Sequence, residues 1–302
     1  MITNFGSLYA GHVDLDDIGL EATAVNDRWF SDEHLNTIYD RATAVAQLMD
    51  RVGYDSFWMA EHHFQREGNE CIGNLLLLYL HLSHLTENLK FGCGFNITPM
   101  WHPLRLAEDF ATVDLLTKGR VIFGVGRGYH SREVDTYGAP STNTDSDANR
   151  DLFEEQVEVM LKAFKEESFS YQGKHYQIPA KVPYRGYDLE KLSLVPRPVN
   201  QPVEVWQPLV SGNPRGVDFM AKMGIKPLIS NNSDPVLADR MKLYRDAVKA
   251  HGQDKELGED VAIGYRFFIA DTQEKAMELA RPYYEEAMKF AAPLGLTPLT
   301  PE

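Results

Sequence analysis

The sequence is poor in cysteine and in positive charge. Its 302 residues include only two cysteines, Cys71 and Cys93, and no CxxC pair. This pattern argues against a disulfide-linked secreted fold and predicts reduced thiols in a cytoplasmic protein. Lysine and arginine total 30 against 44 aspartate and glutamate residues, so the net charge is −14. Because nucleic acids and anionic membranes bind basic surfaces, we expect neither as a partner.

Long apolar runs and the common nucleotide-binding fingerprints are also missing. The most apolar run, Leu75–Leu80, is too short to span a bilayer, and Met1–Gly6 has no features of a secretory signal. No P-loop and no GxSxG elbow occur. The glycines of Gly124–Gly128 fall short of a GxGxxG fingerprint because Tyr129 stands where the last glycine belongs. We therefore expect no stable NAD(P)H site.

Strand-like and helix-like segments alternate along most of the chain. The apolar spacing predicts helices at residues 33–52, 74–86, 103–117, 147–166, 213–223, 234–251 and 272–290. Strands are expected near 2–5 and at 55–60, 89–97, 120–125, 203–207, 226–229 and 261–269. Such alternation predicts an α/β fold with parallel strands, most simply a (β/α)8 TIM barrel; a doubly wound open sheet is the alternative.

Two segments depart from this alternation. Residues 168–202 show no helical period, and we interpret them as an insertion, in the form of a hairpin, between the fourth helix and the fifth strand. Insertions of this kind serve as lids or interface arms. After helix 272–290 no eighth strand and helix follow, which we interpret as a truncated βα unit; another segment filling the gap is the alternative. No compositional break divides residues 1–302, which predicts one domain.

The strand at residues 57–60 runs directly into Glu61, His62 and His63. Three adjacent ionisable groups at the end of a buried strand are typical of an α/β active site. Histidine exchanges its proton nearest to neutral pH, which suits it to acid–base chemistry. The alternatives are a solvated turn or a pair of histidines that only caps backbone groups.

Two further features indicate an anion site. Arg127 follows strand 120–125 among glycines that would let the backbone approach a ligand, and a guanidinium can bind phosphate bidentately. Ser211–Arg215 precedes helix 213–223, and helix N-termini bind anions. The alternatives are an ion pair between Arg127 and Glu108, and plain helix capping. Together the two features favour a phosphate-bearing cofactor. His81 and His84 lack a third ligand at suitable spacing, so no metal site is predicted.

Three blocks of residues together resemble the bacterial luciferase-like flavin-dependent monooxygenases. They are Gly53–Phe64, His102–Phe110 and Asp114–Gly128, and residues 1–290 follow the family's order of elements. The resemblance implies a (β/α)8 barrel that binds reduced FMN. It also implies that the flavin reacts with O2 to give a flavin hydroperoxide, which oxygenates a small organic substrate. Because no dinucleotide fingerprint is present, we expect a separate NAD(P)H:flavin reductase as partner. We also expect a homodimer.

The resemblance assigns roles to individual residues. His62 matches the catalytic histidine of the family, and Arg127 matches a residue that contacts the FMN phosphate. Ser211 and Gly212 fall near the second phosphate-binding segment. The remaining cofactor-binding residues implied by the resemblance are Ala60, Glu61, Gly94, Phe95, Asn96 and Tyr129. Relatives have a non-prolyl cis peptide against the flavin ring at the position of Gly94 and Phe95.

Several alternatives remain open at this point. Gly126 stands where luciferase has a reactive cysteine, which speaks against light emission as the natural role. A sister branch of the superfamily uses the deazaflavin F420 for hydride transfer, and a non-catalytic flavin-binding subunit is a third reading. The substrate is not predicted, because its contacts would come from the loops 6–30, 65–72 and 168–202.

Overall fold

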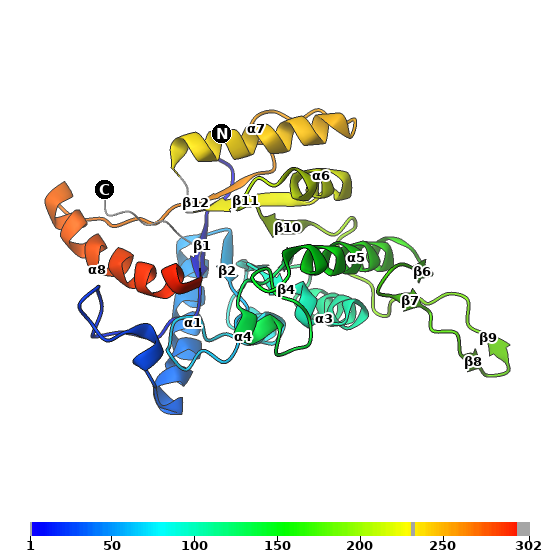
Figure 1. The fold of residues 1–302 in the computed structure, drawn as a ribbon, viewed down its shortest axis with the longest axis horizontal. Coiled ribbons are helices and arrows are strands. Elements are labelled where there is room, and N and C mark those ends of the chain that lie inside the picture. Colours follow the sequence, from blue (N-terminus) through cyan, green and yellow to red (C-terminus); the bar gives the residue numbers. More distant parts are fainter. Residues whose placement is uncertain (1, 231–232, 295–302) are drawn as a thin grey trace.

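Seven parallel strands form a curled sheet, and helices cover its outer face (Figure 1). The structure is a computed structural model that describes residues 2–230 and 233–294. The sheet order is β1 (Gly6–Tyr9), β2 (Ser56–Met59), β3 (Lys90–Cys93), β5 (Val121–Gly126), β10 (Val205–Pro208), β11 (Lys226–Ser230) and β12 (Ala262–Gly264). The short strand β4 (Asn96–Ile97) pairs with β5 at its carboxyl end. The expected α/β alternation is confirmed. Among the described residues β12 and β1 do not pair, so these strands form a half-barrel.

Every predicted long helix is present within a few residues of its expected bounds. These helices are α1 (Asp32–Val52), α2 (Leu75–Ser83), α3 (Pro103–Leu116), α5 (Ser146–Lys165), α6 (Pro214–Met223), α7 (Asp234–Ala250) and α8 (Gln273–Ala291). Side chains cap several of them: Ser31 and Asn74 accept backbone N–H groups at the starts of α1 and α2. Helix α1 ends at Gly53, whose φ of 83° requires the left-handed region. Among the described residues, no helix is both long and apolar enough to cross a bilayer.

The strand predictions need three adjustments. The first strand is β1 at Gly6–Tyr9 and not residues 2–5, and β12 covers only Ala262–Gly264 of the nine residues expected. The segment 89–97 forms two strands, β3 and β4, because a cis peptide between Gly94 and Phe95 interrupts it. A single-sequence pattern of apolar residues does not reveal such an interruption.

The insertion at 168–202 contains two small hairpins where the sequence predicted one. They pair β6 (Tyr171–Gln172) with β7 (Gln177–Ile178), and β8 (Pro183–Tyr184) with β9 (Tyr187–Asp188). Figure 1 shows the second hairpin extending away from the sheet. The truncated βα unit expected after α8 concerns residues 295–302, which lie outside the described residues.

Aromatic side chains fill the core below the carboxyl ends of the strands. The rings of Phe110 (α3), Phe123 (β5) and Phe164 (α5) lie 4.5–5.5 Å apart between sheet and helices. On the inner face, the indole of Trp58 lies against Gly92 and 5.9 Å from Trp206. A Cβ atom on Gly92 would lie 2.1 Å from the indole, so β3 needs glycine there. This packing leaves the carboxyl ends of the strands as the place for chemistry.

Candidate active site

His62 is the third residue after β2, at the carboxyl end of the sheet, and only 5% of it is exposed. Its Nδ1 lies 3.2 Å from Oε2 of Glu133, which belongs to the short helix α4 (Ser131–Val134). Glu133 is 1% exposed and also accepts a hydrogen bond from Gln65 at 2.9 Å. Helix α4 thus presents a buried carboxylate to the imidazole, which fixes the orientation of the ring.

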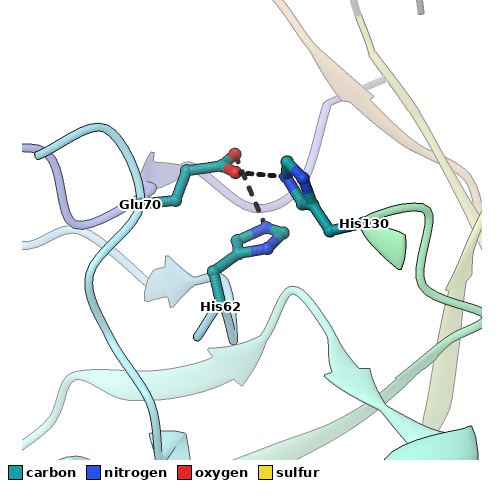
Figure 2. Close-up of side chains that lie close together, drawn as sticks. All are labelled: His62, Glu70 and His130. Atoms are coloured by element: carbon teal, nitrogen blue, oxygen red, sulfur yellow. Dashed lines mark hydrogen bonds and ion pairs between the residues drawn. The ribbon is translucent and has the colours of Figure 1, made fainter. Parts of the chain in front are cut away.

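The other nitrogen of His62 faces a second carboxylate. Its Nε2 lies 3.5 Å from Oε1 of Glu70, and Oε2 of the same glutamate lies 3.1 Å from Nε2 of His130 (Figure 2). The phenol of Tyr129 donates to Glu70 at 3.2 Å. Two histidines and one carboxylate therefore converge from two segments, the loop after β2 and the turn after β5. Such a set also has the ligand types of a metal centre, with ligand atoms within 4.8 Å of one another.

Burial and charge act in opposite directions on these groups. Burial lowers the pKa of His62, but the carboxylates of Glu70 and Glu133 outweigh it, so the pKa is raised above its usual value. Burial raises the pKa of Glu133, and its hydrogen bond to His62 outweighs that effect, so this pKa is lowered. Both directions favour an imidazolium facing a carboxylate.

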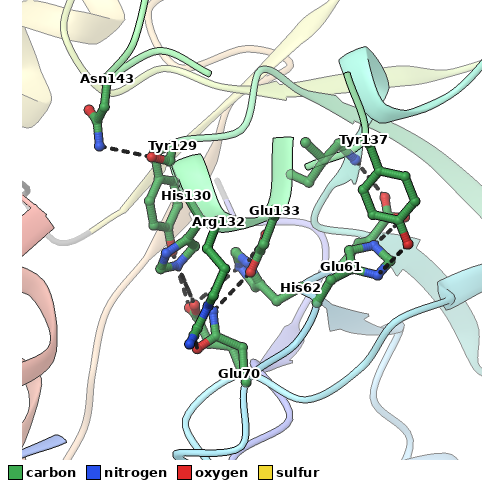
Figure 3. A network of polar contacts seen from close by, with 12 residues as sticks. Glu61, His62, Glu70, Tyr129, His130, Arg132, Glu133, Tyr137 and Asn143 are labelled. Carbon is green, nitrogen blue, oxygen red and sulfur yellow. Dashed lines mark hydrogen bonds and ion pairs between the residues drawn. The ribbon is translucent and has the colours of Figure 1, made fainter. Parts of the chain in front are cut away.

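Further polar contacts hold this arrangement from outside, as Figure 3 shows. Arg132 donates to Gln65 at 2.7 Å and to Glu67 at 2.6 Å, which fixes the amide that in turn contacts Glu133. Asn143 donates to the backbone oxygen of Tyr129 at 2.8 Å. The side chains around His62 are therefore positioned by several independent contacts.

Glu61 has a structural role in addition to any contact with a ligand. Its Oε2 accepts the backbone N–H of Ile97 at 2.6 Å, and its Oε1 accepts the indole N–H of Trp101 at 2.9 Å. His63 lies 3.3 Å from the same carboxylate. Since Glu61 is 1% exposed, it acts first by holding the backbone of β4.

The backbone held by Glu61 includes the cis peptide between Gly94 and Phe95. This peptide was expected from the resemblance, and the structure confirms it. Gly94 donates to the oxygen of Met59 at 2.7 Å, and Asn96 donates to the oxygen of Gly124 at 2.9 Å. Ala60 is buried beside these contacts. The structure therefore brings Ala60, Glu61, Gly94, Phe95 and Asn96 together at the ends of β2, β3 and β5.

Arg127 is half-buried and has neutral partners. Its Nε donates to Asn149 at 2.8 Å, and its other contact is with Ser146 at the start of α5. Burial, together with the cations Arg150 and Arg215, lowers its pKa to about 10. Among the described residues no carboxylate oxygen lies within ion-pairing distance of Arg127, and the expected alternative partner, Glu108, pairs with Arg105. The alternative in which Arg127 pairs with Glu108 is therefore wrong.

The start of α6 adjoins Arg150, one of these cations, and Arg240. A Cβ atom on Gly216 would lie 2.8 Å from Nη1 of Arg150, and one on Gly212 would lie 2.1 Å from Nη1 of Arg240. Asn213, and not Ser211, caps the helix. Ser211 and Gly212 thus precede a helix N-terminus, with the guanidinium of Arg240 beside Gly212 and that of Arg150, which pairs with Glu154, beside Gly216. An anion is the natural ligand of such a place.

The glycines beside Arg127 also have a role in packing that was not expected. A Cβ atom on Gly124 would lie 1.7 Å from the backbone oxygen of Cys93, and one on Gly128 would lie 2.5 Å from Ile97 and Val134. The φ of Gly128 is also positive, at 73°. Gly124 and Gly128 let β5 pack against its neighbours. That the glycines also let the backbone approach a ligand stays a prediction.

Sequence reasoning missed four residues that the structure places in this region: Glu70, His130, Glu133 and Arg150. His130 and Glu133 stand three residues apart after the Arg127 segment, and this adjacency was the available signal. Glu70 lies in a polar loop whose path cannot be read from a local pattern.

Comparison with known proteins identifies the family to which this site belongs. The family model described as "Luciferase-like monooxygenase" matches residues 20–298. The chain belongs to the luciferase-like monooxygenase family. The matched range includes His62, the cis peptide and the Arg127 segment, so the family assignment and the site concern the same residues.

Individual relatives are distant. The alkanal monooxygenase alpha chain of the Kryptophanaron alfredi symbiont is 25% identical over 252 residues, which cover 82% of this chain and 64% of the relative. The chain thus spans less than two thirds of the length of that relative. The FMN complex of the oxygenating constituent of 3,6-diketocamphane monooxygenase from Pseudomonas putida has a TM-score of 0.75 at 21% identity, covering 98% of this chain and 77% of the other. An F420-dependent secondary alcohol dehydrogenase has a TM-score of 0.64 at 17% identity, covering 81% and 70%.

Proposed function

We propose that this protein is the oxygenase component of a two-component flavin system. In this proposal it takes up reduced FMN and uses O2 to oxygenate a small organic substrate. The observation that carries the proposal is the half-buried Arg127, which has no carboxylate partner among the described residues and lies on the same sheet edge as His62. A phosphate-bearing cofactor that reaches from Arg127 to His62 fits this arrangement, and the FMN complex of the oxygenating constituent of 3,6-diketocamphane monooxygenase supports FMN as that cofactor.

Specific residues would hold the cofactor. Arg127 and the start of α6, at Ser211 and Gly212, would bind the phosphate. The backbone at Gly94 and Phe95 would lie against the flavin ring, and Ala60, Asn96 and Tyr129 would border it. Bound reduced flavin supplies the electrons that activate O2, which amino-acid side chains do not supply.

The protein itself contributes a proton donor, His62, at a fixed position. His62 is held by Glu133, is almost fully buried and has a raised pKa, so it can donate a hydrogen bond or a proton near neutral pH. The burial of His62 and Glu133 also keeps bulk water from this point. Both properties suit an oxygenation, in which premature loss of the activated oxygen competes with product formation.

Hydride transfer with F420 is the second candidate function. One observation favours it: the structural likeness to an F420-dependent alcohol dehydrogenase. That likeness is weaker than the likeness to the FMN-bound oxygenating constituent, with TM-scores of 0.64 and 0.75. For this reason we infer that the cofactor is FMN and not F420. Because His62 and Arg127 are both present, we infer that the chain is catalytic and not a non-catalytic flavin-binding subunit.

We also infer four properties of the whole protein. It acts in the cytoplasm, in line with its unpaired cysteines. It is a homodimer, and each chain is a single domain. Its reduced FMN comes from a separate NAD(P)H:flavin reductase. The structural relative named as an oxygenating constituent supports a division of labour between two proteins.

An anaerobic titration of the purified protein with reduced FMN and with reduced F420 tests the function. We expect saturable binding of reduced FMN, and rapid O2 consumption when air is admitted. Preferential binding of F420 would favour hydride transfer, and failure to bind either cofactor would refute both functions. A screen of small ketones, aldehydes and alkanes under turnover then identifies the substrate class.

A further inference from the structure

Glu61 holds the backbone around the cis peptide at two points. Its own backbone N–H donates to the oxygen of Phe95 at 3.4 Å, and its carboxylate accepts the N–H of Ile97 at 2.6 Å. Both contacts fall on the residues that directly follow the cis peptide between Gly94 and Phe95. The position of the Glu61 carboxylate therefore determines where this backbone lies, and in the proposed function this backbone lies against the flavin ring.

The indole of Trp101 orients this carboxylate. Its N–H lies 2.9 Å from Oε1 of Glu61 and 3.2 Å from Oε2, so one donor contacts both oxygens. Because Glu61 is only 1% exposed, its carboxylate depends on donors within the protein. Loss of the indole N–H would leave the carboxylate less firmly oriented, and its bond to the N–H of Ile97 would weaken as a result.

Trp101 is in turn held by Gln156 on helix α5. The side-chain amide of Gln156 is buried, and its Nε2 donates to the backbone oxygen of Trp101 at 2.8 Å and to the hydroxyl of Tyr176 at 2.9 Å. An amide nitrogen has two N–H groups, so both are used here. The reverse orientation would place the amide oxygen of Gln156 against the oxygen of Trp101. The two contacts therefore fix the amide and, through it, the backbone of Trp101.

Tyr176 belongs to the insertion at 168–202, in the turn between β6 and β7. The backbone N–H groups of residues 174–176 all donate to the buried carboxylate of Glu155 on α5, at 2.8–3.0 Å. These bonds tie the first hairpin of the insertion to α5. The hydroxyl of Tyr176 thus has a fixed place beside Gln156, the next residue of the same helix.

We propose that Tyr176, Gln156 and Trp101 are positioning residues for the flavin ring. They act through Glu61 on the backbone of the cis peptide, so the first hairpin of the insertion supports the active site from outside. The inference rests on the proposed function, because that function names what the backbone contacts. Arg127 takes no part in these contacts, since its partners are on α5 and at the start of that helix. Loss of the support should therefore weaken binding of the ring and not of the phosphate.

NMR of the protein without flavin tests the contacts. The chain has four tryptophans, and the indole N–H signal of Trp101 is identified by its loss in Trp101→Phe. Replacing Tyr176→Phe removes the hydroxyl that accepts from Gln156, so this indole signal should shift. Tyr171→Phe is the matched control. It removes a hydroxyl from the same hairpin, but that hydroxyl contacts Glu158, so the indole signal should stay in place.

Flavin binding tests the consequence of these contacts. Trp101→Phe removes one hydrogen bond to Glu61, so reduced FMN and reduced riboflavin should both bind about two- to tenfold more weakly, by the same factor. Tyr176→Phe should change both affinities in the same direction. Equal loss for the two flavins is the sign of an effect on the ring, because riboflavin has no phosphate. If Tyr176 served only the stability of the hairpin, Tyr176→Phe and Tyr171→Phe would behave alike in both measurements.

An indole signal that stays in place in Tyr176→Phe would overturn the proposal, and so would unchanged affinity for both flavins in Trp101→Phe. If Trp101→Phe does not fold, the flavin affinities of Tyr176→Phe and Tyr171→Phe decide the matter. The test is distinguishable from that of the proposed function. A protein that shows the indole shift but binds no flavin would refute the flavin function and leave the path from Tyr176 to Glu61 standing. A protein that binds reduced FMN but shows no indole shift would refute this proposal alone.

Discussion

Nδ1 of His62 lies 3.2 Å from Oε2 of Glu133, although the two residues are 71 positions apart in the sequence. The carboxylate is 1% exposed and is itself fixed by Gln65. Because Nδ1 contacts Glu133, Nε2 is the ring nitrogen that faces Glu70. The contact orients the ring, and together with the charge of Glu70 it outweighs burial and raises the pKa of His62.

Replacing Glu133→Gln should change the pH range over which the enzyme stays coupled. His62 has a raised pKa, so its charged form is present at low pH and is lost as pH rises through that value. Without the Glu133 charge the loss should occur at lower pH. Product formed per O2 consumed, measured across pH, reports the shift. An identical profile in the variant would assign Glu133 a purely structural part.

Replacing His62→Ala should leave reduced FMN binding nearly normal but release hydrogen peroxide in place of product. A positioned acid–base group contributes about 10²–10⁴-fold to rate. Peroxide and product are quantified after a single turnover with reduced FMN. His81→Ala, which changes an exposed histidine of α2, is the matched control. Wild-type coupling in His62→Ala would remove His62 from the mechanism.

Replacing Arg127→Ala should weaken FMN about ten- to hundredfold, since a charge-assisted hydrogen bond contributes about 1.5–3 kcal/mol. Riboflavin, which has no phosphate, should lose much less affinity. Arg105→Ala serves as control because its guanidinium is exposed and pairs with two acids on α3, Glu108 and Asp109. Equal losses for FMN and riboflavin would mean that Arg127 supports the fold and does not bind phosphate.

The protein should not reduce its own flavin, because the sequence has no dinucleotide fingerprint for stable NAD(P)H binding. The purified protein is mixed anaerobically with oxidised FMN and either NADH or NADPH, and the flavin absorbance is followed. We expect slow or no bleaching until a flavin reductase is added. Rapid bleaching without a reductase would refute the two-component assignment.

Replacing Glu286→Gln should destabilise the protein by about 3–5 kcal/mol, because it leaves the buried guanidinium of Arg28 without its anion. Burial raises the pKa of Glu286, but its bonds to Arg28 and Lys289 outweigh this and lower it. The carboxylate's contribution is therefore present above the usual glutamate pKa and is lost as pH falls through the lowered value. Urea unfolding at neutral and acidic pH measures both effects. Glu278→Gln, in an exposed pair on the same helix, should cost under about 1 kcal/mol.

The sequence predicted the helices well because their information is local. The spacing of apolar residues in α1 and the glycine after it define that helix without reference to the rest of the chain. The end of β2 was also predictable, since a buried strand stops at three ionisable residues. The family resemblance added the cis peptide, which no periodicity could reveal.

The contacts of His62 were not predictable in the same way. Glu70 and His130 stand 60 positions apart, and neither has a local pattern that marks it as a partner of the other. The packing role of the glycines near Arg127 could not be predicted from the local sequence either. Their function became clear only when Cys93 and Ile97 were seen where a Cβ atom would be. The close packing of neighbouring strands is thus a reason for glycine at these positions that the local sequence does not reveal.

The ion pair between Arg28 and Glu286 also has a consequence for the order of folding. The two residues are 258 positions apart, and closing a chain segment of that length costs about 5 kcal/mol in entropy by the (3/2)RT ln n scaling. Contacts of such high sequence separation form late, after the intervening strands and helices have shortened the path between their ends. Substitutions at this pair should therefore accelerate unfolding far more than they slow folding. The α8 ring of Phe290 would then reach His130 only in the last stage of folding.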